Sequence, residues 1–170
     1  MDFPELPEIE TLRLRLACLK RADAAQLRDL TDDPAIVAAI HFLKAPVTLA
    51  YAEALIRGAQ PGIDRLFGIR RCEDGRLVGI VGAGLIGADR LEIGYWIGSA
   101  WQGRGYATEA AGALLEQRRR LFPRRRIFAE CRRDNGASWR VLEKLGFRPA
   151  GQRGERPGRE LLLWGGDGPG

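Results

Sequence analysis

Histidine and cysteine, the residues that most often hold transition metals, are scarce in this sequence. It has one histidine, His41, and three cysteines, Cys18, Cys72 and Cys131, which lie more than 50 residues apart. This spacing excludes a local zinc motif and argues against a disulfide framework. We therefore expect no bound metal, three reduced thiols that are buried or half-buried, and a reducing cytoplasm as the compartment.

Long apolar runs are also missing. The longest stretch without a charged residue, residues 77–88, has 12 residues of which four are glycine, and this is too short to span a membrane. The first residues lack the basic start and the apolar core of a signal peptide. The sequence therefore predicts a protein without a membrane segment, and its 170 residues suit a single domain.

Positive charge is concentrated in one part of the chain. Residues 1–100 carry 12 basic and 14 acidic residues, whereas residues 101–170 carry 15 basic and 8 acidic ones. A basic C-terminal part indicates that it handles an anion. Six arginines lie within Arg118–Arg126, a run that would suit a non-enzymatic nucleic-acid or ribosome-binding module. We keep this module as the alternative function, disfavoured because the run lacks the interleaved aromatic residues that stack on bases.

The first half of the chain predicts one strand, three short helices and an antiparallel meander. Apolar residues alternate with arginines over residues 11–16, which is typical of a strand with one solvated face. Helices are predicted to begin at a capping box of Asp23 and Gln26, at Asp33 before a proline, and at Thr48. Strands joined by short turns follow at residues 65–71, 76–85 and 91–97.

The second half alternates helices and strands. Its predicted elements are a helix at residues 107–119, a strand at 126–131, a helix at 135–145, and strands at 147–152 and 159–164. This order predicts an α+β fold in which helices and a sheet form layers. We expect residues 1–10 to form an N-terminal arm, residues 11–164 a single domain, and residues 165–170 a flexible C-terminal tail.

A glycine-rich stretch at residues 82–87 matches the G-x-G-x-x-G fingerprint of dinucleotide-binding proteins. That motif requires a helix to begin within it, because the helix N-terminus holds the pyrophosphate. Here the next residues predict a turn and a strand, and Gln102 occupies the place of the acidic residue that would bind the ribose. We therefore interpret the stretch as a strand whose missing side chains let its neighbours pack closely.

A second glycine cluster, residues 102–107, lies between a predicted strand and a predicted helix. In this context small residues let backbone N–H groups converge, and the helix N-terminus adds its positive end. Arg104 adds a full charge that can reach phosphate oxygens. The loop is thus a candidate phosphate site, and a plain strand-to-helix turn is the alternative.

The helix predicted from Asn135 has an apolar face and ends at Gly146. Asn135 suits the N-cap position, and Ser138 falls in the first turn, where a hydroxyl is common. Taken alone, these residues have mainly structural roles.

Together these motifs resemble the GNAT superfamily of acetyl-CoA-dependent N-acetyltransferases, and in particular its branch of ribosomal-protein alanine N-acetyltransferases. The resemblance runs over residues 11–164 and is strongest at residues 92–97 with 101–110, and at residues 135–147. It implies an acyltransferase with a GNAT-like α+β fold. In that fold a central, mixed but mostly antiparallel twisted sheet is flanked by helices, and two strands splay apart at the cofactor cleft.

The resemblance further implies acetyl-CoA as cosubstrate. The loop of residues 102–107 would hold the pyrophosphate through backbone N–H groups. The strand end would pair with the pantetheine, and an N–H near Ile97 would donate to the thioester oxygen. The cofactor-binding residues so implied are Trp96, Ile97, Gln102, Gly103, Arg104, Gly105, Tyr106, Ala107, Asn135 and Ser138.

Direct attack of an amine on the thioester is the reaction that the resemblance implies, and a base must first take a proton from the amine. Glu92 is the first candidate, with a solvated or ion-paired strand residue as its alternative. His41, whose ordinary pKa is near neutrality, is the runner-up base, with a surface position at a helix end as its alternative. Ser138 stands where members of this branch often protonate the departing CoA thiolate, and Cys131 is assigned to the core.

The amine acceptor remains open. Residues 35–60, which shape the acceptor pocket in relatives, match no subfamily that we identify. A protein N-terminal amine, a small-molecule amine such as an aminoglycoside or a polyamine, and an amino acid all remain candidates. A homodimer also stays open, and no membrane or nucleic-acid partner is expected.

Overall fold

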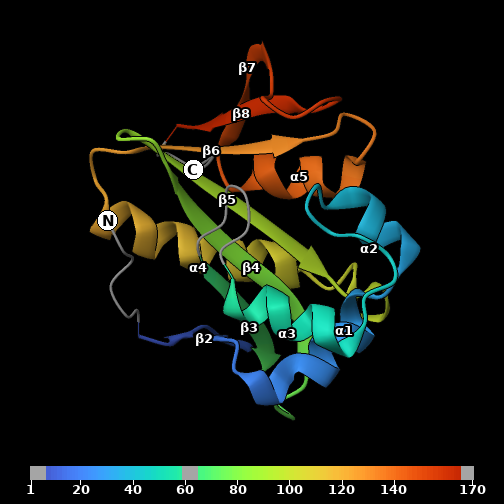
Figure 1. The fold of residues 1–170 in the computed structure, drawn as a ribbon. Helices are drawn as coiled ribbons and strands as arrows, with labels where there is room; N and C mark the ends of the chain where they lie inside the picture. Colours follow the sequence, from blue (N-terminus) through green and yellow to red (C-terminus); the bar gives the residue numbers. More distant parts are fainter. Residues whose placement is uncertain (1–6, 59–64, 166–170) are drawn as a thin grey trace.

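The computed structural model describes residues 7–58 and 65–165. Within them the chain forms one sheet in the order β1-β2-β3-β4-β5-β6-β8-β7 (Figure 1). Its strands are β1 (Ile9–Glu10), β2 (Leu14–Cys18), β3 (Arg65–Arg71), β4 (Leu77–Ile86), β5 (Arg90–Ile97), β6 (Arg126–Cys131), β7 (Phe147–Arg153) and β8 (Glu160–Trp164). All neighbouring strands are antiparallel except β5 and β6, so the sheet is mixed but mostly antiparallel, as predicted.

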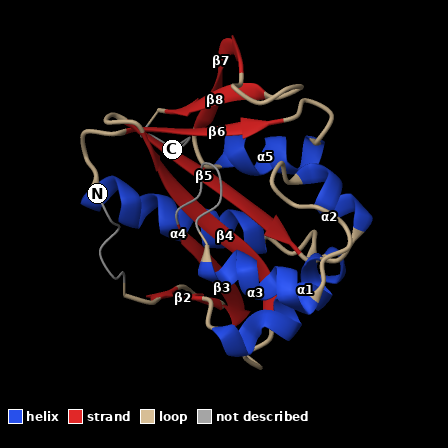
Figure 2. Cartoon of the chain, viewed as in Figure 1, coloured by secondary structure: helices blue, strands red, loops and turns tan. Residues whose placement is uncertain are grey.

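Two layers of helices pack against this sheet (Figure 2). The α-helices are α1 (Ala24–Thr31), α2 (Pro34–Ala39), α3 (Leu49–Arg57), α4 (Tyr106–Leu121) and α5 (Gly136–Lys144). One apolar core joins side chains of α4 and α5 to the sheet, and a second joins side chains of α1, α2 and α3 to it. The predicted α+β class is therefore confirmed.

Most predicted elements lie within one or two residues of their observed bounds, because local signals mark them. Asp33 accepts a hydrogen bond from the backbone N–H of Ala35, and Thr48 accepts one from that of Tyr51, so both cap their helices as predicted. β1 was not predicted and lies inside the range assigned to the N-terminal arm. The predictions for residues 1–6 and 166–170 lie outside the described residues.

The capping box predicted at Asp23 is wrong. Its carboxylate accepts hydrogen bonds from the backbone N–H of Lys20 and from the guanidinium of Arg70, and it does not cap α1. The competing partner is a charged side chain on β3, 47 residues further along the chain. Asp23 has a helical backbone as the last residue of the 3-10 helix Arg21–Asp23, which is not the usual N-cap geometry, and local sequence does not reveal its contact with Arg70.

Residues 82–86 of the glycine-rich fingerprint lie in β4, Gly87 lies in the turn that follows, and no helix begins there, so the interpretation as a strand is confirmed. A close approach of the neighbouring strand occurs at Gly79, earlier in β4. A Cβ there would lie 2.6 Å from Cδ1 of Ile97 and 2.7 Å from the backbone oxygen of Trp96 on β5. Glycine at this position therefore lets β5 lie against β4 right up to its end.

The feature that positions the site is the separation of β5 from β6. The two strands pair only from Arg90 opposite Arg126 to Glu92 opposite Phe128. β5 nevertheless stays paired with β4 as far as Ile97. Beyond Glu92 the parallel strands diverge, and the gap between them is visible in Figure 1. The predicted splay is confirmed.

Candidate active site

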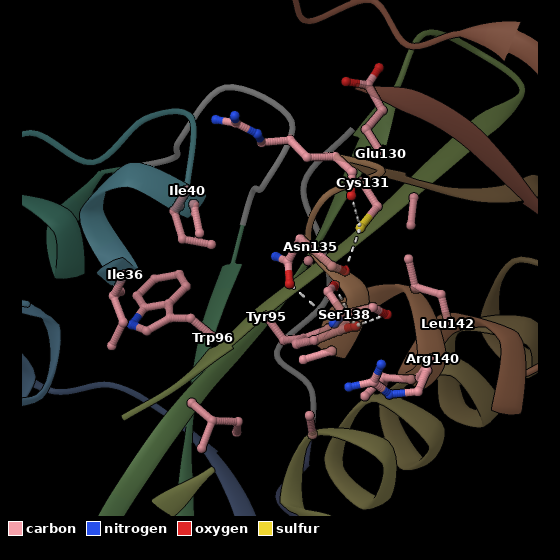
Figure 3. A pocket seen from close by; sticks show the side chains of 18 of the residues that line it. Ile36, Ile40, Tyr95, Trp96, Glu130, Cys131, Asn135, Ser138, Arg140 and Leu142 are labelled. Atoms are coloured by element: carbon pink, nitrogen blue, oxygen red, sulfur yellow. Dashed lines mark hydrogen bonds between the residues drawn. The ribbon is translucent and has the colours of Figure 1, made fainter. Parts of the chain in front are cut away.

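A cavity of about 760 Å³ lies where β5 and β6 separate, and Figure 3 shows it from close by. Its walls come from α2, β5, the loop after β5, the ends of β6 and α4, α5 and the loop before β8. Of the predicted site residues, Arg104 is the one outside this lining. The structure thus brings together residues that the sequence separates by up to about a hundred positions.

Side chains alternate across β5, so the cavity has two sides. Trp96 packs into the core of α1, α2 and α3, whereas Ile93 and Ile97 pack into the core of α4 and α5. In Figure 3 Trp96 accordingly points toward Ile36 on α2, and Tyr95 lies beside Ser138 on α5. We call these the α2 side and the α5 side.

Two glycines shape the loop before α4. Gly103 has φ +76° and Gly105 has φ +80°, a left-handed conformation that other residues adopt only with strain. Gly105 is also the N-cap residue of α4. The first N–H groups of a 16-residue helix therefore face the cavity at this loop, an arrangement suited to phosphate.

The loop is braced from the segment between β1 and β2 by residues that sequence reasoning missed. The carboxylate of Glu109 on α4 accepts hydrogen bonds from Thr11 Oγ1 over 2.7 Å and from the backbone N and Nε of Arg13 over 2.8 and 2.7 Å. Burial alone would raise the pKa of Glu109, but these hydrogen bonds lower it. Arg13 Nη1 also donates to the backbone oxygen of Arg104 over 2.9 Å, which fixes the loop.

Arg104 itself turns outward from the lining. Its guanidinium lies 5.1 Å from the ring centre of Trp101, and its Nη2 donates to the backbone oxygen of Ala100 over 3.4 Å. The structure gives it no carboxylate partner among the described residues.

The backbone of β5 presents unpaired groups to the gap. The N–H of Gly98 donates to Val78 on β4, and backbone groups alternate along a strand, so the N–H groups of Tyr95 and Ile97 point away from β4. The backbone oxygen of Ile97 accepts a hydrogen bond from Gln102 Nε2 over 2.9 Å. Gln102 thus ties the glycine loop to the strand, and that oxygen is already occupied.

Tyr95 and Ser138 form a hydrogen-bonded pair on the α5 side. The two hydroxyl oxygens lie 2.9 Å apart, and Tyr95 also donates to the backbone oxygen of Ser138 over 3.2 Å. Asn135 caps α5 by accepting from the N–H of Ser138. Burial raises the pKa of Tyr95 well above its ordinary value, so this phenol stays protonated. The sequence analysis did not include Tyr95 among the site residues. Its position on β5, next to the predicted site residue Trp96, was the signal that could have indicated it.

Cys131 ends β6 on the same side, buried in the core as assigned. Burial raises the pKa of its thiol. Cys18 is half-buried, but Cys72 is exposed, which corrects the expectation of three buried or half-buried thiols.

Glu92 is buried on the α2 side, at the point where the strands part. Arg156, from the loop before β8, binds both oxygens of its carboxylate, and Nη2 lies 2.6 Å from Oε2. Arg156 also forms an ion pair with Glu130 on β6, with Nη1 3.3 Å from Oε2. Burial raises the pKa of Glu92, and Arg156 opposes that rise. Both the ion-paired and the catalytic interpretations therefore have support in the geometry.

His41 follows α2 and lines the rim of the cavity. Its ring is exposed and packs edge-on against Phe42, with the ring centres 5.1 Å apart. Phe42 in turn packs against Trp96. His41 therefore lies on the α2 side, as Glu92 does, but nearer the solvent.

The arginine run at the end of α4 does not form one free basic surface. Arg118 is fully buried with its guanidinium 5.6 Å from the ring centre of Phe67. Arg119 and Arg120 both pair with Glu116. Charges of the run are thus partly used within the fold, which weakens the nucleic-acid alternative.

Residues 7–58 and 65–165 offer neither a membrane-spanning helix nor a metal-binding cluster. No helix in that part of the chain is long and apolar enough to cross a bilayer. No cluster of three or more histidine, cysteine, aspartate or glutamate side chains there could hold a metal ion.

Comparison with known proteins identifies the family. Residues 13–148 match the model of the acetyltransferase (GNAT) domain. An uncharacterized N-acetyltransferase, YnaD, of Bacillus subtilis (strain 168) is 39% identical over 83 residues, which are 49% of each chain. The match therefore spans about half the length of this curated relative.

Solved structures show the same fold. A GNAT-family acetyltransferase from Bacillus anthracis superimposes with a TM-score of 0.79 at 24% identity, over 92% of this chain and 96% of that one. RimL, a ribosomal L7/L12 α-N-protein acetyltransferase solved with coenzyme A, gives a TM-score of 0.79 at 19% identity, over the same shares. The predicted family and its acyltransferase class are confirmed, and the chain belongs to the acetyltransferase (GNAT) family.

Proposed function

We propose that this protein transfers an acetyl group from acetyl-CoA directly to a primary amine. The observation that carries the proposal is the gap between β5 and β6, which begins at Glu92 and ends beside the glycine loop of α4. An extended pantetheine arm fits beside the unpaired N–H groups of β5 as an added strand would. The loop then meets the pyrophosphate with N–H groups and the positive end of α4.

On the α5 side the chain supplies a hydrogen-bond donor and an acid. The N–H of Ile97 donates to the thioester oxygen as negative charge develops there, which lowers the barrier. Ser138 gives a proton to the departing thiolate, and Tyr95 holds the Ser138 hydroxyl in place. Asn135, which caps α5, contacts the pantetheine arm.

On the α2 side Glu92 takes the proton of the attacking amine, directly or through water. A carboxylate has about four lone-pair sites, so its pair with Arg156 leaves room for one more donor. His41 at the rim is the alternative base, because its ordinary pKa suits proton transfer near neutrality.

The acceptor is a protein N-terminal amine, a small-molecule amine or an amino acid, and the compartment is the cytoplasm. Support for a peptide acceptor comes from RimL, whose name describes a ribosomal-protein acetyltransferase with the same fold. The proposal also includes assembly of the protein as a homodimer.

A screen for CoA release tests the proposed function. The purified protein is mixed with acetyl-CoA and a panel of peptide, amino-acid, polyamine and aminoglycoside acceptors, and free thiol is measured. We expect acceptor-dependent release of CoA with one class of amine. Release that does not depend on any amine would contradict transfer to an amine.

A further inference from the structure

Arg159 is a half-buried cation on the wall of the cavity. It lies directly before β8, and its Nη2 donates to the backbone oxygen of Ala39, at the end of α2, over 2.6 Å. The guanidinium therefore bridges two elements of the α2 side. A guanidinium has five N–H donors, so this one contact leaves most of its donor capacity unused.

The acidic residues around Arg159 are committed to other arginines. Arg156 holds Glu92 and Glu130, as described above. Glu160, the next residue in the chain, binds Arg133 over 2.6 Å. Glu155 binds Arg90 over 2.8 Å. Within residues 7–58 and 65–165, no ion pair joins Arg159 to a carboxylate.

This environment favours an added anion. Burial lowers the pKa of Arg159, and the neighbouring positive charge of Arg156 lowers it further. The charge of Glu130 opposes this change, but no ion pair of the described residues joins a carboxylate directly to this half-buried guanidinium, whose N–H groups a planar carboxylate matches in pairs. An anion placed here would thus be bound more strongly than at an exposed arginine.

The cofactor does not supply this anion in the proposed arrangement. Its phosphates meet the loop at Gly103 and Gly105, whose N–H groups open beside α4 and the α5 side. Arg159 lies on the α2 side with Glu92, where the proposed base receives the amine. The group that can reach Arg159 is therefore part of the acceptor.

We propose that Arg159 binds a carboxylate of the acceptor, so that the enzyme acetylates primary amines that also carry a carboxylate. This inference rests on the proposed acetyl transfer and narrows its acceptor to amino acids or short acidic peptides. It disfavours polyamines and aminoglycosides, because their additional positive charges would meet Arg156 and Arg159.

Matched acceptors that differ only in charge test the inference. The probes are alanine against alanine amide, which tests the α-carboxylate, and Ala-Glu amide against Ala-Gln amide, which tests a side-chain carboxylate, with rates corrected for the fraction of unprotonated amine. We expect the parent protein to prefer the carboxylate-bearing member of at least one pair by about tenfold or more in kcat/KM, mainly through a lower KM. A preference of this size is what one bidentate charge-assisted contact contributes. Arg159→Gln should bring that ratio close to one, and Arg159→Lys should restore part of it.

Arg153→Gln is the matched control, because Arg153 is an exposed arginine of β7 outside the cavity. It should keep the parent's preference. Equal rates for acid and amide in the parent protein, or a preference that survives in Arg159→Gln, would overturn the inference while leaving acetyl transfer intact. Absence of both acetyl-CoA binding and CoA release would instead defeat the proposed function, and this inference with it.

Discussion

Tyr95 and Ser138 form the contact from which the proposed acid role can be tested at the scale of single residues. The two hydroxyl groups lie 2.9 Å apart, and Asn135 fixes the backbone of Ser138 independently of the hydroxyl. Removing the Ser138 hydroxyl therefore removes a proton donor without removing the cap of α5.

Ser138→Ala should lower kcat by about 10²-fold, the lower end of what a positioned acid contributes, and leave the Kd of acetyl-CoA nearly unchanged. Tyr95→Phe, which keeps the ring and loses the hydroxyl, should lower kcat by a smaller factor because it acts through Ser138. Steady-state kinetics and calorimetry measure the two effects. An unchanged kcat in Ser138→Ala would remove its acid role.

In the proposed mechanism, Glu92 and Arg156 determine the pH dependence of the reaction. A base acts when it is deprotonated, so kcat/KM falls as the pH drops through the pKa of Glu92. Burial raises that pKa above the ordinary value of 4.5, and Arg156 opposes the rise. Arg156→Gln should therefore move the acid limb of the profile to higher pH, and Glu92→Gln should abolish it.

Acetyl-CoA binding serves as the control for folding in both variants, because Arg156→Gln leaves two buried carboxylates without their cation and Glu92→Gln leaves Arg156 with Glu130 alone. A profile that is identical in Glu92→Gln and in the parent protein would transfer the role of base to His41 or to water. If the pair of Glu92 and Arg156 were only structural, both variants would change the free energy of unfolding but leave the acid limb of the pH profile of kcat/KM in place.

At the scale of elements, the loop between β5 and α4 forms the proposed phosphate site. Gly103 and Gly151 both have a left-handed backbone, with φ +76° and +71°, and a Cβ would meet nothing within 4 Å at either. Alanine should therefore cost about 1–2 kcal/mol of stability at each position through strain alone.

Only Gly103→Ala should also weaken acetyl-CoA binding, by about tenfold, because strain there shifts the N–H groups that face the phosphates. Gly151→Ala, in β7 and outside the cavity, is the matched control. Calorimetry and thermal unfolding of both variants separate affinity from stability. Equal affinities in the two variants would argue against a phosphate site at this loop.

Elements were predictable where their signals are local, and contacts were not where they cross the chain. The turn glycines and the caps Asp33 and Thr48 marked element ends within one or two residues. Asp23 does not cap α1, because its carboxylate binds the backbone N–H of Lys20 and the guanidinium of Arg70. Arg70 lies 47 residues further along the chain, so its contact could not be predicted from the local sequence. The pairing of Glu92 with Arg156 spans 64 residues, so its effect on the proposed base was not foreseeable from either segment.

At the scale of the whole molecule, one irregularity in the sheet organises the site. β5 follows β4 to its end and leaves β6 after three residue pairs, which opens a cavity with an α5 side and an α2 side. The motifs around residues 92–110 and 135–147 predicted residues that line the α5 side, where we propose that the cofactor binds. The α2 side, proposed for the acceptor, depends on α2 and on the loop before β8, whose side chains meet only in the folded chain.

The basic excess of residues 101–170 separates into different uses at this scale. Arg104 lies in the proposed phosphate loop, and Arg156 neutralises two buried carboxylates. Arg118 is buried within the fold. The charge asymmetry of the sequence therefore reflects the internal pairing of the C-terminal part as much as the proposed anion.

Calorimetric titration with acetyl-CoA and, separately, with NAD tests the central claim most directly. The gap beside β5 and the glycine loop of α4 predict saturable binding of one acetyl-CoA per chain, and the strand structure of residues 82–86 predicts none of NAD. Binding of NAD, or no heat of binding with acetyl-CoA, would contradict the account.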